Sequence, residues 1–379
     1  MDEMDQEEQQ KQFDLIWRRY PEKFNRTSTD WWFFLLLPKQ AGGYGPSQAM
    51  FTLVSRAGDS FSFNLQQHAG LDRQVRATGE GEHFPALAYG WYFDGLDMHE
   101  DLVHHSSPAV LSPKGSIEAW TEAEDGKKLG GGIRSFGDKP FGLQAEFSDI
   151  NGGIRFEAWG DPRSRTTAPG HVYDYNYKPA GFYVQSWRHL QFAGEVTHPN
   201  GTEQLEGIGY FQRVNFNIPL FPWKWIYAAF EDGSIFSCTT PYIGPHLLRR
   251  GDRFFPGGLE KATLPIIKGA FFHWQDARET VVLNKVKVTP IAGDKYPTFT
   301  VECSSPAGDF IRFEIVPYTH LQILVDHPLR NGRWFSRFNY NEYPFRVANL
   351  EGVAGGRALD NKTLGQGFGN CEYTWGLGL

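Results

Sequence analysis

The sequence predicts an almost entirely β protein with more than one domain. Its 379 residues exceed the usual size of a single domain, so two domains are expected. Aromatic residues make up 16% of the chain, and such residues favour the pleated surface of a sheet over a helix. The 42 Gly and 23 Pro indicate many turns. After Pro21, most apolar segments are short or alternate with a period of two, as strands do.

The first predicted element is a helical N-terminal extension over residues 1–23. Within it, residues 5–20 place apolar side chains such as Phe13 and Ile16 at helical spacing, and Pro21 ends the helix.

Short strands separated by Gly, Pro, Asn and Asp follow this extension. No strong helix recurs between them, which argues against a parallel α/β sheet. The Pro- and Gly-rich stretch 241–269 is predicted to connect a first β domain, residues 24–250, to a second, residues 251–379. Periodicity does not separate a sandwich from a barrel, but a closed barrel removes sheet edges and can hold a ligand. The clearest strand-like segments are 51–55, 60–65, 154–159, 182–187 and 281–288.

Charge and cysteine content argue against several classes of protein. The net charge of −7 and the pI near 6.0 oppose phosphate binding, and no Lys/Arg-rich run indicates nucleic acid. The widely spaced Cys238, Cys303 and Cys371 fit reduced, buried thiols better than a disulfide framework. The first 20 residues are acidic without an apolar signal core, and the apolar run 31–37 is too short to cross a bilayer. We therefore expect a cytoplasmic protein with no stable membrane insertion.

Residues 206–227 form the densest candidate segment for a site. If 210–215 is extended, Tyr210 and Gln212 share one face of the strand, while Arg213 and Asn215 share the other with Phe211.

Three large aromatic residues further on also alternate onto one face. They are Trp223, Trp225 and Tyr227. Such a surface is either the core of a sheet or the wall of a ligand pocket, and the sequence leaves both open.

Acidic residues beside indole rings are the candidate proton donors. Asp30 precedes Trp31 and Trp32, and Glu372 lies between aromatic residues just before Trp375. A carboxylate in such surroundings can be desolvated, which raises its pKa and lets it keep a proton to donate. The alternative for each is an exposed acid at a strand end.

Two further motifs carry no clear site. His99, His104 and His105 are of metal-ligand type, but their spacing matches no standard site and predicts a solvated loop. The Gly-rich stretch 130–132 matches neither common phosphate loop. We expect no metal and no cofactor.

The chain carries, in this order, Asp30-Trp31-Trp32, Tyr183–Trp187, Gly194–Arg213 with its Gly207-Ile-Gly-Tyr210, Gln212–Phe216, Trp223-Lys-Trp225 and Glu372-Tyr-Thr-Trp375. Together these segments resemble the lipocalin-like superfamily that contains carotenoid 1,2-hydratases, tocopherol cyclases and fungal intramolecular Diels–Alderases. The resemblance implies two lipocalin-like β-barrel or β-sandwich domains with a pocket for a polyene, terpenoid or polyketide. Where the hydratase-like members have an Asp-His pair, this chain has Gln212 and Arg213, and neither is an ordinary proton donor. The substitution favours a cyclase or cycloaddition catalyst over a hydratase.

The leading hypothesis is an enzyme that binds an apolar small molecule in an aromatic-lined pocket and cyclises or hydrates it. In a cycloaddition, Gln212, Arg213 or Asn215 would polarise a carbonyl. In an acid-initiated reaction, Glu206, Asp30 or Glu372 would donate the proton, and the aromatic faces would stabilise the cation. The substrate-binding candidates are Trp32, Tyr210, Asn215, Trp223, Trp225, Tyr227 and Trp375.

Two other classes of function use the same residues. A carrier of a hydrophobic small molecule needs the pocket but no specific polar group. A carbohydrate-binding protein would present Trp223 and Trp225 as stacking platforms on an open surface. The sequence predicts neither the substrate nor the oligomeric state.

Overall fold

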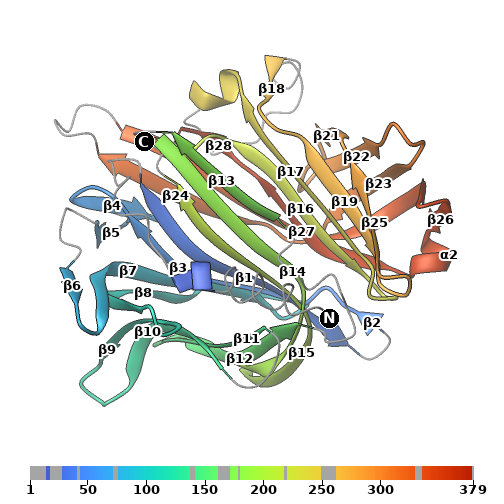
Figure 1. Cartoon of the computed structure of the whole chain (residues 1–379). Helices are drawn as coiled ribbons and strands as arrows, with labels where there is room; N and C mark the ends of the chain where they lie inside the picture. Colours follow the sequence, from blue (N-terminus) through green and yellow to red (C-terminus); the bar gives the residue numbers. More distant parts are fainter. Residues whose placement is uncertain are drawn as a thin grey trace, which may run out of the picture. The chain divides into compact units, whose positions relative to one another are not determined.

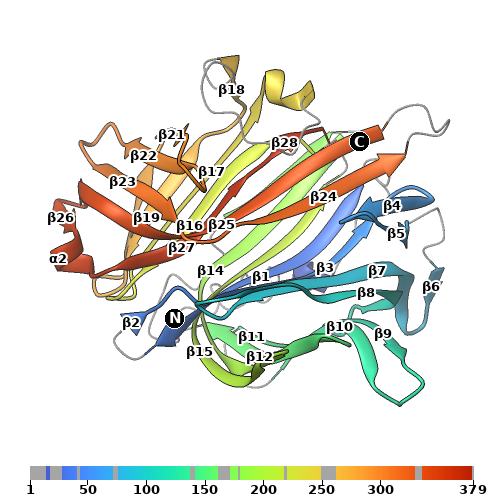
Figure 2. The same cartoon turned by 180° about the vertical axis from the view of Figure 1, so that it is seen from behind.

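The computed structural model shows a chain built almost entirely of antiparallel strands (Figures 1 and 2). Its described helices are short: η1 (Leu15–Trp17), η4 (Pro245–Leu248) and α2 (Asn361–Leu364). The all-β fold predicted from the sequence is confirmed. The structure describes residues 14–17, 28–40, 43–70, 76–136, 141–160, 171–177, 180–216, 220–248, 262–328 and 335–377.

The predicted N-terminal helix over 5–20 lies largely outside the described residues. The described part contains η1, in which Ile16 and Trp17 are buried. No helix in the described part of the chain is long and apolar enough to span a membrane.

The chain divides into two compact units. The first unit consists of Met1–Lys39, Ser47–Phe61 and Gln67–Pro219. The second consists of Gln40–Pro46, Ser62–Gln66 and Leu220–Leu379.

Ten strands of the first unit close into an antiparallel barrel. Their order is β12-β11-β10-β9-β8-β7-β3-β1-β15-β14, and β14 pairs back with β12. The first half of β14 also pairs with β13 (His171–Tyr177), and β6 (Arg76–Thr78) pairs with β7. The barrel strands are β1 (Thr29–Gln40), β3 (Gln48–Arg56), β7 (Gly81–Phe93), β8 (Met98–Ser112), β9 (Ser116–Glu122), β10 (Lys128–Ser135), β11 (Gly142–Asp149), β12 (Gly152–Gly160), β14 (Ala180–His198) and β15 (Gly201–Phe216).

The core of the first unit follows from the alternation of its strands. In β1, Trp32, Phe34 and Leu36 belong to the buried apolar cluster, and the residues between them point to the other face. Gly90 lies directly opposite Phe51, and a Cβ at Gly90 would come within 2.1 Å of the Phe51 ring. Glycine at this position lets the aromatic ring cover the neighbouring strand.

The second unit contains a curled antiparallel sheet in the order β20-β19-β17-β16-β27-β25-β23-β22-β21. Its two edge strands, β20 and β21, are separated only by Asn284, and residues of both belong to one apolar cluster. The sheet therefore wraps around its own core. Its strands are β16 (Trp223–Phe230), β17 (Ile235–Ile243), β19 (Gly269–Trp274), β20 (Glu279–Leu283), β21 (Lys285–Ile291), β22 (Thr298–Ser304), β23 (Phe310–Pro317), β25 (Phe335–Ala354) and β27 (Gly367–Tyr373).

Several shorter strands add to this sheet. The pair Ser62–Phe63 of β4 (Ser60–Phe63) bonds to β24 (Leu321–Pro328), so a segment from early in the chain completes the second unit. In Figures 1 and 2 the blue β4 lies beside the orange β24. The others are β18 (Leu264–Pro265), β26 (Arg357–Asp360) and β28 (Trp375–Gly376), and the remaining short strands of the chain are β2 (Gly43–Tyr44) and β5 (Gln66–Ala69).

The unit boundary near residue 220 differs from the predicted division between 24–250 and 251–379. Strands β16 and β17 precede residue 250, but they pair with β27 and β19 and so belong to the second sheet. Strand pairing decides the boundary, and the Pro- and Gly-rich composition of 241–269 does not reveal it.

The second core contains all three cysteines. Cys238, Cys303 and Cys371 are buried and free, as the sequence predicted.

Candidate functional site

The second unit places two glutamates directly opposite each other on neighbouring strands. Glu342 of β25 pairs in register with Glu372 of β27, and Glu372 also lies opposite Trp225 of β16. Residues directly opposite in an antiparallel sheet project from the same face. The alternate residues of β27 and β25, such as Cys371 and Tyr343, belong to the apolar core. The two carboxyl groups therefore lie on the face of the sheet that is turned away from this core.

Both oxygens of Glu372 accept hydrogen bonds. The Tyr340 hydroxyl donates to Oε1 at 2.5 Å, and the Trp223 indole Nε1 donates to Oε2 at 2.5 Å. The Glu372 carboxyl is thus held in one orientation, and it is 7% exposed.

The Glu342 carboxyl is fully buried but only half satisfied. Its Oε2 accepts a hydrogen bond from Asn370 Nδ2. Its Oε1 and the Asn370 Oδ1 have no hydrogen-bond partner among the described residues. Buried polar atoms are nearly always paired, so these two oxygens are candidates to accept hydrogen bonds from a ligand.

The environment raises the pKa of both carboxyl groups. Burial raises the pKa of Glu342 from its ordinary 4.5 to about 7, and the hydrogen bond from Asn370 and the nearby Tyr340 hydroxyl only partly oppose this. Burial, followed by repulsion from Glu342, raises the pKa of Glu372 well above its ordinary value. Burial and the two carboxyl groups also keep the Tyr340 phenol protonated, with a pKa well above its ordinary value. Two neighbouring carboxyl groups of this kind titrate as a pair and retain a proton near neutral pH.

Aromatic rings surround the carboxyl pair. The Trp223 ring lies 5.0 Å from that of Phe338 and 5.7 Å edge-on from that of Tyr340. Trp225 and Tyr227 stack with an interplanar angle of 12° and a centroid distance of 6.1 Å. Trp223 and Tyr340 are half-buried, whereas the two carboxyl groups beside them are buried.

This arrangement can donate and accept a proton in an apolar environment. A carboxylic acid with a pKa near neutrality is an efficient general acid, and its conjugate base is an efficient general base. The aromatic faces can stabilise a cation that forms next to it.

The other predicted acid, Asp30, lies in a different environment inside the first unit. Its Oδ1 accepts from Arg213 Nη2 at 2.5 Å and from Asn215 Nδ2 at 3.0 Å. The Arg213 guanidinium stacks over the Trp32 ring at 3.9 Å, and Nε donates to the Ile16 carbonyl at 3.2 Å. Asp30, Trp32 and Arg213 are fully buried. The Arg213 guanidinium therefore neutralises the charge of the Asp30 carboxylate inside the first unit.

The remaining predicted residues are distributed over several places. Gln212 donates to the Tyr210 hydroxyl at 2.9 Å, on the opposite face of β15 from Arg213, as the alternation predicted. Glu206 is exposed and so lacks the burial expected of a proton donor. Trp375 is buried in the core of the second unit. The structure therefore joins Glu372, Trp223 and Trp225 on one face of the second unit's sheet, whereas Asp30 and Arg213 belong to the first unit.

Comparison with known proteins supports the fold. No protein-family model and no curated protein matches the sequence. Among solved structures, an AttH-like protein from Nitrosomonas europaea matches with 11% identity and a TM-score of 0.50, over 93% of this chain and 96% of that one. The lipocalin-like fold is confirmed.

Two other solved structures are also similar over most of their length. Kievitone hydratase from Nectria haematococca is 13% identical with a TM-score of 0.43, over 91% of this chain and 88% of that one. CghA, solved with Sch210972, is 8% identical with a TM-score of 0.42, over 93% of this chain and 89% of that one.

Sequence reasoning missed Glu342 and Tyr340. The segment that carries them, Phe338-Asn-Tyr-Asn-Glu-Tyr343, has the same pattern as the segment around Glu372: an acid between aromatic residues in a strand. That pattern was a usable signal, but the pairing of the two segments was not visible before the register was known.

Proposed function

We propose that this chain is an enzyme that transfers a proton to an apolar small molecule, a terpenoid, polyene or polyketide, through the Glu342–Glu372 pair. The observation that carries the proposal is the direct opposition of two buried glutamates whose pKa values are both raised. A purely structural pair of this kind would destabilise the fold without any gain, because burying two carboxyl groups together is unfavourable.

In the proposed reaction, Glu342 is the proton donor, because its Oε1 has no hydrogen-bond partner among the described residues. Glu342 gives its proton to an alkene carbon of the substrate, which leaves a carboxylate and a carbocation. Ring closure followed by loss of a proton to the same carboxylate completes a cyclisation. Addition of water, with the water proton passing to the carboxylate, completes a hydration.

The other residues of this face have supporting roles. Trp223 and Tyr340 hold Glu372 in place, and repulsion from Glu342 helps to keep the pKa of Glu372 raised. The rings of Trp225 and Tyr227 offer aromatic faces to the cation.

The acid-initiated reaction is better supported than a cycloaddition promoted by Arg213. That guanidinium is fully buried and already bonded to Asp30, Ile16 and the backbone carbonyl of Val214. It has little capacity left to polarise a substrate carbonyl.

The test begins with native mass spectrometry of the protein purified from its own host, which identifies a retained ligand. That ligand, or geranylgeraniol as an isoprenoid probe, is the test compound. The compound is then incubated with the protein in deuterium oxide. We expect a product that carries deuterium at carbon. Glu342→Gln should slow its formation by about 10² to 10⁴-fold. Glu206→Gln, which changes an exposed glutamate in the first unit, is the matched control and should leave the rate unchanged.

A hydrophobic carrier gives a different result in the same experiment. It would return the retained compound unchanged and without deuterium, with Glu342→Gln binding as tightly as the unmodified protein. That outcome would overturn the proposal.

A further inference from the structure

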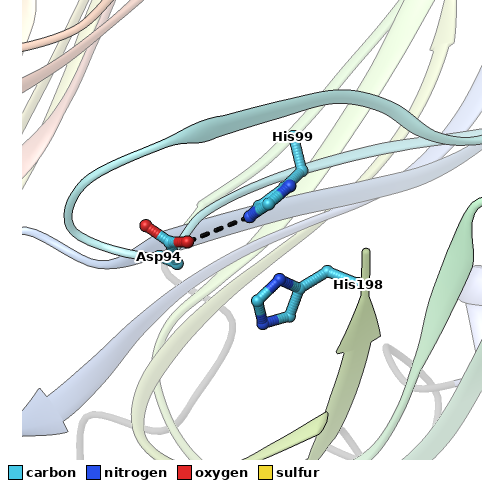
Figure 3. A group of neighbouring side chains, drawn as sticks. All are labelled: Asp94, His99 and His198. Atoms are coloured by element: carbon cyan, nitrogen blue, oxygen red, sulfur yellow. Dashed lines mark hydrogen bonds and ion pairs between the residues drawn. The ribbon is translucent and has the colours of Figure 1, made fainter. Parts of the chain in front are cut away.

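A second cluster of titratable side chains lies in the first unit, where several barrel strands end. Asp94 follows the last residue of β7, and His99 lies at the start of β8. His198 is the last residue of β14, and Glu203 lies across the hairpin near the start of β15. Figure 3 shows Asp94, His99 and His198 gathered around a common point.

The Asp94 carboxylate is aimed by its own turn. Its Oδ1 accepts hydrogen bonds from the backbone amides of Leu96 and Asp97, at 2.7 Å each. This leaves Oδ2 directed at His99 Nε2, 3.0 Å away. The carboxylate therefore presents one oxygen to the cluster in a fixed direction.

The His198 ring is fixed in the tautomer that a metal ligand needs. Its Nε2 lies 2.8 Å from Glu203 Oε1, and an ionised carboxylate only accepts, so Nε2 carries the proton. Nδ1 then has a free lone pair. This atom is buried, and no described residue offers it a hydrogen-bond partner. The side chain is 3% exposed, and Figure 3 shows Nδ1 on the edge of the ring that faces Asp94 and His99.

We propose that Asp94, His99 and His198 bind a divalent transition-metal ion, with zinc as the best fit. One ligand atom from each residue lies within 4.8 Å of the others. Neighbouring ligands of a tetrahedral zinc ion lie about 3.3 Å apart when each is about 2.0–2.1 Å from the metal. Small side-chain rotations therefore suffice. The metal takes the place of the proton between His99 Nε2 and Asp94 Oδ2, and that proton is released to solvent.

The surroundings match those of known histidine ligands. A histidine bound to zinc usually donates its other ring N–H to a carboxylate, as His198 does to Glu203. Tyr92 donates to the second oxygen of that carboxylate at 3.0 Å. Three protein ligands leave the fourth position of a tetrahedral ion for water. Asp94 is 12% exposed and Glu203 is 43% exposed, so an ion can enter from solvent.

An ordinary His–Asp ion pair does not account for this geometry. Such a pair would need only Asp94 and His99, whereas His198 brings a second ring to within 4.4 Å, centroid to centroid. The other histidine pair of this unit differs, because His68 Nε2 and His104 Nε2 lie 3.1 Å apart and bond to each other. Sequence spacing predicted no metal, because the spacing of His99, His104 and His105 matches no standard site.

The test uses the full chain after treatment with a chelator and dialysis. Titration with Co²⁺ should produce visible absorption bands typical of a tetrahedral or five-coordinate ion at one equivalent, and Zn²⁺ should displace them. Zn²⁺ should also raise the melting temperature. His198→Asn and Asp94→Asn should each weaken Co²⁺ binding more than about a hundredfold. Glu203→Gln should weaken it about 10- to 100-fold, as loss of a supporting carboxylate does.

Two controls make the result decisive. His104→Asn alters the other histidine pair and should leave Co²⁺ affinity unchanged. Glu342→Gln, in the second unit, should also bind Co²⁺ normally, so the test of the metal site is independent of the test of the proposed reaction. Circular dichroism confirms that each variant is folded. Loss of the bands in His104→Asn but not in His198→Asn, or absence of the bands in the unmodified protein, would overturn the proposal.

Discussion

The two units each bury a carboxylate beside a tryptophan on a central strand, but they neutralise its charge differently. In the first unit, Asp30 is paired with the Arg213 guanidinium, which itself lies on the Trp32 ring. In the second unit, Glu372 faces Glu342, and no cation is bonded to either carboxyl group among the described residues. A cation neutralises the first carboxylate, and a proton must neutralise the second pair.

This difference decides which acid can take part in chemistry. An acid paired with a guanidinium has its charge neutralised by that partner and serves the fold. An acid that is neutralised by a proton carries the group that a general acid needs. The residue types beside the acid are similar in both places, so the partner across the strand determines the role.

The role of the ion pair in the first unit is tested most directly by removing its cation. Arg213→Met leaves the Asp30 carboxylate buried without its partner. We expect a loss of about 3–5 kcal/mol in the free energy of unfolding, measured by urea denaturation. Asp30→Asn combined with Arg213→Met should recover much of this loss, because the uncompensated charge is gone. A loss below about 1 kcal/mol in the single variant would show that Asp30 does not depend on the ion pair.

The raised pKa of Glu342 in the second unit is tested by the pH dependence of stability. Folded Glu342 holds its proton up to about pH 7, whereas the unfolded chain loses it near pH 4.5. Stability should therefore fall as pH rises through this window, by up to about 1.4 kcal/mol per pH unit for this group. Glu342→Gln should remove this contribution. Its free energy of unfolding should therefore fall by about 2–3 kcal/mol less than that of the unmodified protein between pH 4.5 and pH 8. Parallel stability curves for the two proteins would show that Glu342 has an ordinary pKa.

A smaller effect should sharpen the assignment of Tyr340. Tyr340→Phe removes the hydroxyl that donates to Glu372 Oε1, and we expect a loss of about 1–2 kcal/mol. The same hydroxyl lowers the pKa of both carboxyl groups, so its removal should extend the fall in stability to higher pH. Urea denaturation across a pH series measures both quantities. An unchanged pH window would mean that the hydroxyl does not interact with the pair.

The smallest effect is expected at Glu206. This glutamate is exposed, so Glu206→Gln should change the free energy of unfolding by less than about 0.5 kcal/mol. Urea denaturation measures the difference. A change above about 1 kcal/mol would mean that Glu206 has an interaction that its exposure does not indicate, and would weaken the contrast between exposed and buried acids.

Local pattern was enough to predict the faces of β15. Alternation placed Tyr210 and Gln212 on one side and Arg213 and Asn215 on the other, and their hydrogen bonds confirm this arrangement. The period of two in a strand is a property of neighbouring residues, so it can be read from a single segment.

Partners across strands could not be predicted in the same way. Asp30 meets Arg213 and Asn215 only because β1 pairs with β15 in one register, and a shift of one residue would turn Asp30 to the other face. Glu342 and Glu372 lie 30 positions apart in sequence and meet for the same reason. His99 and His198 come together through the closure of a barrel. In each case the candidate residue type was visible, and the chemistry depends on a pairing that single segments do not encode.

The pairing of β4 with β24 has a consequence for synthesis on the ribosome. Ser62 and Phe63 leave the ribosome long before their partners Asp326 and Val325 exist. At about 5–20 residues per second, the delay is on the order of 10 to 50 seconds. During that time the nascent chain displays an unpaired strand edge, which other chains could capture. Slow translation should therefore lower the yield of correctly folded protein, and a chaperone that covers extended segments should restore it.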